Sequence, residues 1–464
     1  MTADPKTRAS HRPALLASLL AFALVSAACG TGASPATTTP SAPPAASASP
    51  TSAPPSPAPS GTAAASPNPT ASRVPGATPD PADAAVYRAI EDQIAAIRGV
   101  QPTERLEPTV LDEPALRARL QADFDKKNPP AEIREGEIFL KALGLLPADA
   151  SLRDVYLDLM GSQVAGFYDL EVNQMFLVSR KGGIGPSEKA TFAHEFVHAL
   201  QDQHFGADRL TDEEASKGQS DRAAAWLSVV EGDATIGQFL WLQNHLTPEE
   251  LQQVMTESSD PEATAALNRA PAILRENLMF PYSAGAQFDM AAYVEGGWPA
   301  IDALYQKLPE STEQILHPEK YKAGEAPRPV SIPAADVARA LGDGWTVADE
   351  DTAGEFFLSV WLRERGATGP APEPDGTPVP ASGAAAGWGG DRTVLLTGPG
   401  DSYALVMATT WDTADDAAEF ATASRSAVKG LPGASAVRAA GDAVTVLLAS
   451  DAGVLQRLGA ALPE

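Results

Sequence analysis

The stretch that decides the fold is FAHEFVHALQDQHFG, Phe192–Gly206, which holds three of the six histidines in this 464-residue chain. Its apolar residues recur at helical spacing, so we expect a helix over Ser187–Gln203 that the following glycine ends. On such a helix His194 and His198, four residues apart, place both imidazoles on one face. Glu195 projects beside that face. The stretch therefore predicts a helix that carries a cluster of metal-binding groups.

The spacing HExxH, formed by His194, Glu195 and His198, is typical of zinc peptidases. In that arrangement the two histidines bind the metal, and the glutamate takes a proton from the metal-bound water. We therefore expect one Zn²⁺ ion at His194 and His198, with Glu195 as the catalytic base.

Two residues compete to be the third metal ligand. His204 follows His198 by six residues, and on an unbroken helix it would point about 120° away from it. Glu231 lies in AWLSVVEGDATIG, on a second helix expected over Asp221–Asn244. Apolar residues surround it there, and a buried carboxylate needs a cation or strong hydrogen bonds. The sequence therefore favours Glu231, which two antiparallel helices would bring to the histidine pair.

The segments HEFVHALQDQHF and VEGDAT together resemble the gluzincin metallopeptidases, and more narrowly the peptidase-MA-like lipoproteins and surface proteins. The downstream segments FPYSAGAQF and STEQILHPEKY add to this likeness, which covers about residues 100–365. The resemblance implies zinc bound by His194, His198 and Glu231, with Glu195 as base. The sequence differs from thermolysin-like enzymes at Thr235, where those enzymes carry an aspartate. It also lacks the GxMEN signature of the aminopeptidases, so trimming of peptide ends is not expected.

Peptide hydrolysis also requires a donor for the oxyanion that develops on the carbonyl. Tyr282 and His317 are the candidates. Zinc-bound histidines usually donate their second N–H to a carboxylate or carbonyl, and Asp202, one turn after His198, is placed either to accept it or to remain solvated. Asp233 projects to the other side of its helix from Glu231, so we expect a structural hydrogen bond there.

The N-terminus reads as an export signal over residues 1–28, with a basic start and then an apolar run too short for a confident membrane span. It ends in VSAAC at Cys29, the only cysteine, which resembles a bacterial lipobox in which the thiol receives a lipid. Ordinary cleavage near Ala28 is the alternative. Residues 29–82, rich in Ser, Pro, Ala and Thr, are expected to be a disordered tether.

The periodicity of the remaining chain predicts an α+β protein with two folded parts. A mostly helical zincin-type metallopeptidase domain is expected over 83–365, with a β-hairpin whose outer strand, Asn173–Ser179, would align a peptide. Its last helix is expected over Thr346–Arg365. A Pro/Gly/Ala-rich linker is expected over 366–385 and a small α+β domain over 386–464.

These features predict a zinc metallopeptidase that acts on peptides or proteins while lipid-anchored to the outer face of a bacterial cell membrane. The formal charge of −26 makes nucleic acid an unlikely partner, because an acidic surface repels phosphates. The alternative is a catalytically inactive zincin-fold surface lipoprotein that acts as a binding or structural module. An open coordination position would distinguish the two, because a structural zinc site has four protein ligands.

Overall fold

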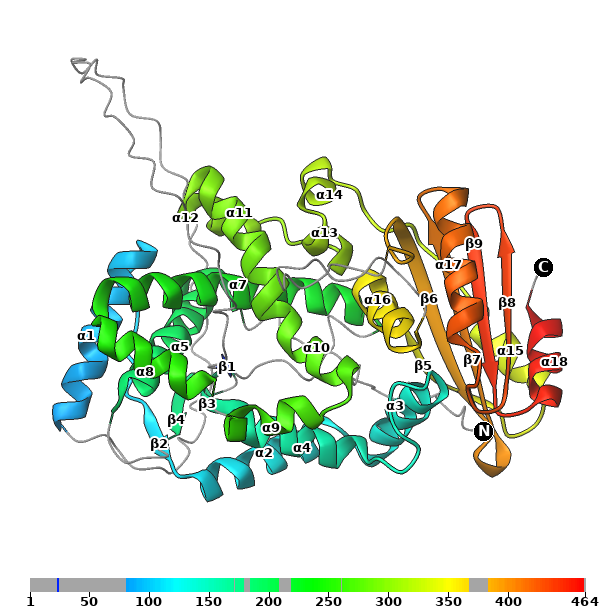
Figure 1. Cartoon of the computed structure of the whole chain (residues 1–464), viewed down its shortest axis with the longest axis horizontal. Helices are drawn as coiled ribbons and strands as arrows, with labels where there is room; N and C mark the ends of the chain where they lie inside the picture. Colours follow the sequence, from blue (N-terminus) through cyan, green and yellow to red (C-terminus); the bar gives the residue numbers. More distant parts are fainter. Residues whose placement is uncertain are drawn as a thin grey trace, which may run out of the picture.

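The computed structural model describes residues 23–24, 81–170, 172–178, 184–207, 218–259, 261–366 and 383–462. Two separate sheets and many helices make the described chain α+β, as the sequence predicts. Figure 1 shows a mostly helical part and, beside it, a sheet that helices cover. The expected signal peptide and tether lie outside the described residues, apart from 23–24 and 81–82, and so does most of the expected linker.

A small sheet supports the helix that carries HExxH. Its strand order is β1 (Ala23–Leu24), β3 (Val164–Asp169), β4 (Gln174–Val178) and β2 (Thr109–Leu111). The hairpin of β3 and β4 is confirmed, with Phe167 opposite Phe176. The expectation that its outer strand aligns a peptide is wrong, because β2 already pairs in parallel with β4. This run of three residues is too short to recognise from periodicity. The edge strand is therefore β3, and among the described residues only the two of β1 pair with its outer edge.

The helix that carries HExxH is α5 (Pro186–Phe205), which packs against α1 (Pro81–Arg98), α7 (Ser220–His245) and β3. Its apolar residues Phe192, Phe196 and Leu200 are buried in one cluster with residues of α1, β3, β4 and α7. The helix ends as expected at Gly206, whose φ of 67° is a left-handed conformation that glycine adopts without steric cost.

The other helices of this part wrap around that centre (Figure 1). Among the residues described, none of the helices is both long enough and apolar enough to span a bilayer. Their bounds are α2 (Glu113–Lys127), α3 (Pro130–Ala142), α4 (Leu152–Gln163), α8 (Pro248–Ser258), α9 (Pro261–Arg269), α10 (Ala272–Phe280), the π-helix η2 (Pro281–Gly285), α11 (Ala286–Gly296), α12 (Trp298–Leu304), α13 (Thr312–Leu316) and α14 (Pro318–Ala323).

The C-terminal sheet is antiparallel, in the order β5, β6, β7, β9, β8, and helices cover both of its faces. Alternate strand residues separate into two cores, one shared with α16 and α17 and the other with α15 and α18. The elements are α15 (Ala334–Leu341), β5 (Thr346–Asp351), α16 (Gly354–Glu364), β6 (Trp388–Thr397), the 3₁₀ turn η3 (Pro399–Asp401), β7 (Tyr403–Trp411), α17 (Ala414–Ala427), β8 (Ala434–Ala440), β9 (Ala443–Ala449) and α18 (Ala452–Ala461).

The boundary between the two parts lies earlier than the sequence predicts. The helix expected over Thr346–Arg365 begins only at Gly354, because residues 346–351 form β5 and pair with β6. The acidic composition TVADED conceals this strand, since aspartate and glutamate are depleted in strands. The C-terminal sheet therefore starts on the N-terminal side of the expected linker.

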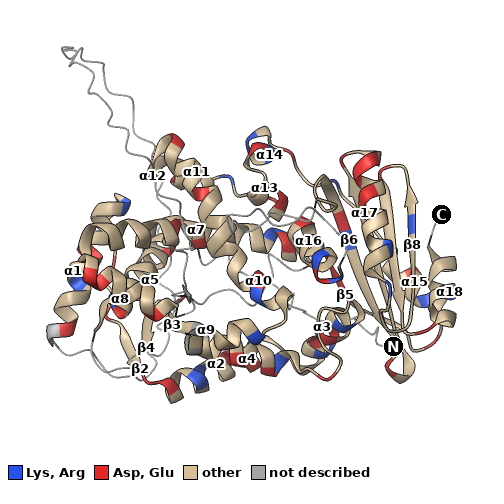
Figure 2. Ribbon diagram, viewed as in Figure 1, with Lys and Arg blue, Asp and Glu red and all other residues tan. Residues whose placement is uncertain are grey.

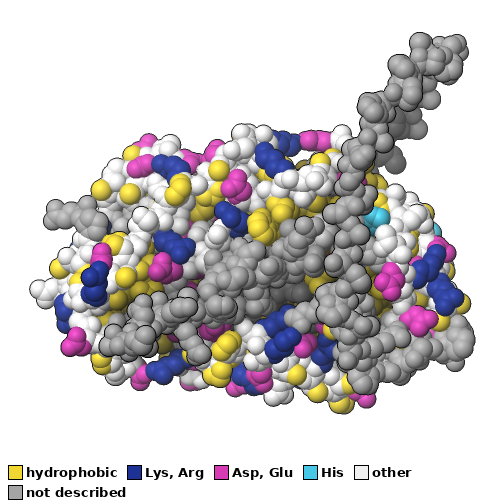
Figure 3. All heavy atoms as spheres, turned by 180° about the vertical axis from the view of Figure 1, so that it is seen from behind, with side chains coloured by type: hydrophobic (Ala, Val, Ile, Leu, Met, Phe, Trp, Pro, Cys, Tyr) yellow, Lys and Arg dark blue, Asp and Glu magenta, His cyan; other side chains and the backbone are white. Residues whose placement is uncertain are grey.

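One hydrophobic cluster crosses between the two parts. It joins Leu140 of α3 and Leu274 of α10 to Trp361 of α16 and to Leu405 and Met407 of β7. The two parts consequently share a core and do not meet only through their surfaces. On the face drawn in Figure 3, positive and negative side chains are intermixed rather than separated by sign.

Candidate metal centre

α5 and α7 bring three potential metal ligands together. His194 Nε2 lies 3.2 Å from Glu231 Oε2 and 3.1 Å from His198 Nε2, while His198 Nε2 lies 3.3 Å from Glu231 Oε2. His194 and Glu231 are 1% and 2% exposed, so the cluster is buried. The helix pair thus places Glu231 opposite the two histidines, as the sequence analysis expects.

This triangle fits a tetrahedral metal ion. Ligand atoms about 2.0–2.1 Å from a tetrahedral zinc lie about 3.3–3.4 Å from one another, close to the three separations here. Within the described ranges, no fourth His, Cys, Asp or Glu joins this group. The donor set of two imidazoles and one carboxylate with an open position is the type found in catalytic rather than structural zinc sites.

The charges of the cluster are strongly coupled. Burial by itself would lower the pKa of His198, but the Glu231 carboxylate outweighs it and raises that pKa to about 9. Burial would likewise raise the pKa of Glu231, but His198 and the hydrogen bond from His194 lower it to about 2. The direction of both shifts shows that the Glu231 carboxylate and the histidines stabilise each other's charge in a buried environment.

Glu195 lies beside the triangle with one oxygen fixed and the other free. Its Oε2 accepts a hydrogen bond of 2.9 Å from the backbone N–H of Tyr168 on β3. Its buried Oε1 has no hydrogen-bond partner in the described structure. Burial is the largest influence on Glu195 and raises its pKa above the usual range. The strand next to α5 thus orients the carboxylate that the HExxH spacing marks as the base.

Gln201, which the sequence analysis did not single out, orients His198. The Nδ1 atom of His198 lies 2.8 Å from Gln201 Oε1, and Gln201 Nε2 donates to the carbonyl of Val230 at 2.9 Å. Gln201 is fully buried and joins α5 to the residue before Glu231. Asp202, the expected candidate for this role, instead accepts a hydrogen bond from the Tyr168 hydroxyl at 3.1 Å.

A buried ion-pair network supports the other side of Glu231. Arg98 Nε donates to Asp233 Oδ1 at 2.9 Å, and Arg98 also pairs with Asp302 at 2.6 Å. The Tyr305 hydroxyl donates to Asp233 as well. The structural hydrogen bond expected at Asp233 is therefore confirmed, and it ties α7 to α1 and α12.

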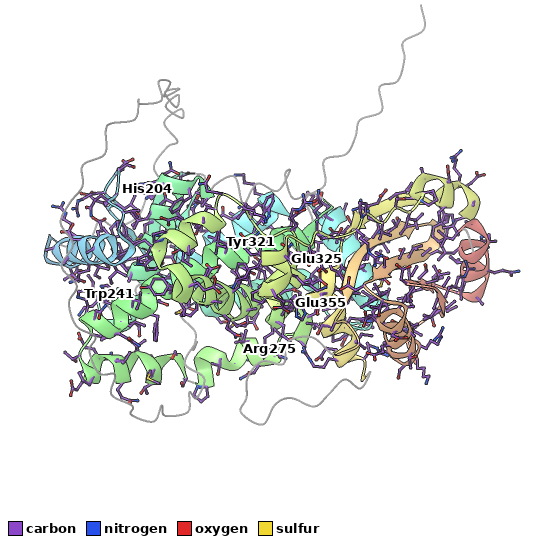
Figure 4. The ribbon with its side chains drawn as sticks, turned by 90° about the horizontal axis from the view of Figure 1, so that it is seen from above. His204, Trp241, Arg275, Tyr321, Glu325 and Glu355 are labelled. Carbon is purple, nitrogen blue, oxygen red and sulfur yellow. The ribbon has the colours of Figure 1, made fainter. Side chains whose placement is uncertain are left out.

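Tyr282 lies against the cluster and His317 pairs elsewhere. The Tyr282 ring stacks on His194 with centroids 6.0 Å apart, and its residue belongs to the π-helix η2, an element frequent at functional sites. The Nε2 atom of His317 lies 3.0 Å from Glu355 of α16. Figure 4 places Glu355 toward the C-terminal sheet. The structure thus brings Tyr282 to the candidate metal ligands, whereas His317 pairs with Glu355.

Glycines allow η2 to approach α7. A Cβ atom at Gly232 would lie 2.6 Å from the carbonyl oxygen of Gly285, and one at Gly285 would collide with the Ser228 carbonyl. Gly237, further along α7, faces Val197 of α5 in the same way. Gly232 therefore serves the contact with η2, and Gly237 the contact with α5.

His204 does not join the cluster. It is exposed, and its Nε2 donates to the backbone carbonyl of Gln101 at 2.7 Å. Figure 4 shows it toward the α1 end of the molecule. This is the direction that an unbroken helix predicts for a residue six positions after His198.

Residues 345–460 match a protein family described as a domain of unknown function (DUF8575). The match begins one residue before β5 and extends into α18, so it coincides with the C-terminal sheet and does not include the metal centre. No curated protein and no solved structure matches the chain.

Proposed function

We propose that the protein is a zinc-dependent metallopeptidase of the gluzincin type, with a zincin fold, that cleaves internal peptide bonds. The observation that carries the proposal is the triangle of His194, His198 and Glu231, with the free oxygen of Glu195 beside it. The sequence also resembles the peptidase-MA-like lipoproteins in the segments HEFVHALQDQHF and VEGDAT, which supports the gluzincin class.

The chain's own residues divide the work of hydrolysis. A bound Zn²⁺ supplies the Lewis acid that lowers the pKa of water and polarises the peptide carbonyl. Glu195 Oε1 takes the proton of the attacking water and passes it to the departing amine nitrogen, while Tyr168 N–H holds Oε2 in place. The raised pKa of Glu195 makes the carboxylate a stronger base. Tyr282 is our candidate donor to the oxyanion, because its ring lies on His194.

An extended peptide would bind along β3. Among the described residues, only Ala23–Leu24 pair with the outer edge of this strand, antiparallel at Gly166 and Val164. The same strand positions Glu195 through Tyr168. Backbone hydrogen bonds to β3 would therefore place a substrate carbonyl beside the catalytic groups without demanding a particular sequence.

The decisive experiment combines zinc content with peptide turnover. We expect the purified protein to hold one zinc by elemental mass spectrometry, and Glu231→Gln to lose it. The matched control His204→Gln, on the same helix as the histidine pair, should keep it. Glu195→Gln should keep the zinc and lose about 10²–10⁴-fold or more in turnover of a peptide library.

Other outcomes distinguish an active peptidase from a catalytically inactive zincin-fold lipoprotein. Undiminished turnover in Glu195→Gln would refute the mechanism. Stable zinc binding in the parent with no cleavage of any peptide would favour the inactive zincin-fold lipoprotein. A folded parent without zinc would refute the metal site itself.

We also propose export and lipid anchoring to the outer face of a bacterial membrane, supported by the basic start, apolar run and VSAAC at Cys29. Expressed in a bacterium with a tagged fatty acid, the protein should acquire the label, and Cys29→Ser should remove it. Label retained in Cys29→Ser, or absent from a correctly exported parent, would contradict the anchor.

A further inference from the structure

A cavity of about 90 Å³ lies where the helical part meets the C-terminal sheet. Helices α3, α4, α7 and α10 form one wall, and β5 with α16 forms the other. Its volume accommodates several water molecules or a short alkyl chain. Small-molecule sites concentrate at such junctions between two folded parts. None of the three proposed zinc ligands lines the cavity, so it is separate from the metal centre.

The lining combines apolar walls with a single sign of charge. Phe139, Leu140, Leu274, Phe280 and Phe356 supply apolar surface. Five carboxylates also line the cavity, and among the described residues that line it there is no lysine, arginine or histidine. The acidic residues are Glu132, Glu135, Asp221, Asp349 and Asp351.

The positions of these acids follow from the two elements that face each other here. On α3 the cavity face contains residues 132, 135, 136, 139 and 140, which is the spacing of one helical stripe. Glutamates thus occupy two positions of a stripe that is otherwise apolar or glycine. On β5, Asp349 and Asp351 alternate toward the same side. Figure 2 shows acidic residues on both elements.

Two of the carboxylates are buried and have hydrogen bonds without a counter-ion. Asp221 accepts from the backbone N–H and the hydroxyl of Thr312. Asp351 accepts from Ser220 and from the N–H of Thr352. In the part of the chain that the structure describes, neither forms an ion pair. Burial raises the pKa of both groups, that of Asp351 to about 7, which is the mark of carboxylates that lack a compensating cation.

We propose that this cavity binds an organic cation that carries a primary ammonium group on a short apolar stem. The stem packs against the phenylalanine and leucine side chains, and the ammonium group lies among the carboxylates. A free alkylamine and the side chain of a lysine in a peptide share this chemistry. Ala224, in the cavity wall, lies seven residues before Glu231, on the same face of α7 and about 10 Å away along its axis.

Calorimetric titration with hexylamine and with hexan-1-ol at pH 8 tests the proposal without zinc or turnover. The parent protein should bind the amine at least about tenfold more tightly than the alcohol, because the two probes differ only in the ammonium group. Asp351→Asn should weaken the amine about tenfold and leave the alcohol unchanged. The matched control is Glu350→Gln, which removes a neighbouring charge that pairs with Arg392 outside the cavity, and it should change neither.

Equal affinity for the amine and the alcohol would overturn the proposal, and so would an equal loss of amine binding in Glu350→Gln. If Asp351→Asn fails to fold, Ala224→Leu provides the second test, because it fills the cavity without changing its charge. That variant should weaken both probes, and undiminished binding would place the amine elsewhere. Competition by a lysine-containing peptide, but not by its norleucine counterpart, would assign the ligand to a peptide side chain. Competition by free amines alone would assign it to a small molecule.

Discussion

At the scale of single residues, Gln201 connects both helices of the candidate metal centre. Its carbonyl oxygen lies against His198 Nδ1, and its amide nitrogen donates to the Val230 carbonyl. The two histidines are predictable, because HExxH fixes their spacing on one helix, and Glu231 is predictable as a carboxylate amid apolar residues of the next helix. The role of Gln201 is not predictable, because no motif shows whether a glutamine in a helix contacts a histidine or faces solvent. The sequence favours Asp202 as the partner of His198, because carboxylates are common partners of zinc-bound histidines.

Replacing Gln201 should weaken metal binding. We expect Gln201→Leu to raise the zinc dissociation constant about 10–100-fold, since His198 loses the group that fixes its ring and tautomer. Competition with a chromophoric chelator measures this constant. Gln203→Leu is the matched control, because Gln203 lies on the same helix but binds the loop at Thr103 and Glu104. Equal zinc affinity in the Gln201 variant and the control would show that the contact does not support the metal.

At the scale of elements, the close contact of η2 with α7 determines where Tyr282 lies. Gly232 and Gly285 leave no room for a side chain between these two elements. The long helices and the hairpin could be predicted, because their periodicity is strong. The strand β2 could not, because three residues are too short to show a period. The acidic strand β5 and the alanine-rich strand β8 could not, because aspartate, glutamate and alanine are depleted in strands.

Adding one methyl group at this contact should displace Tyr282 from His194. The Cβ atom in Gly285→Ala would meet the Ser228 carbonyl, and we expect a loss of about 1–3 kcal/mol in stability together with reduced peptide turnover. Urea unfolding and steady-state kinetics measure the two effects. Gly161→Ala, on α4, is the control, since only the flexible side chain of Arg117 lies near it. That variant should be as stable as the parent or more so, and similar behaviour of the two would contradict the argument.

At the scale of the whole molecule, Lys320 links the helical part to the C-terminal sheet. Its ammonium group lies 2.6 Å from Glu313, 2.8 Å from Glu325 and 2.5 Å from Asp412 at the end of β7. The three carboxylates have the spacing of a metal site, but the lysine already occupies their centre. The sequence indicates two folded parts, yet it does not reveal that they share a core, because contacts between distant segments leave no local pattern.

Removing this lysine should destabilise the junction. Lys320→Met leaves three carboxylates without their cation, and we expect it to lower the free energy of unfolding by about 1–3 kcal/mol. Chemical denaturation followed by tryptophan fluorescence measures this change. Lys322→Met, two residues along α14, removes an exposed pair with Glu295 and should change stability by at most about 0.5 kcal/mol. Equal stability of the two variants would assign the junction to apolar packing alone.

The Pro/Gly/Ala-rich segment of residues 367–382 lies, in the chain, between two strands of the same sheet, so it does not separate two domains. Strand β5 and helix α16 precede it, and β6, the partner of β5, follows it. A proteolytic cut in this segment would therefore leave two fragments that remain joined through strand pairing and a shared core. We therefore expect separately expressed halves to reassemble, whereas a truncation at the same point would remove the strand that pairs with β5. The segment interrupts a single folded unit, so it is an insertion within the C-terminal sheet.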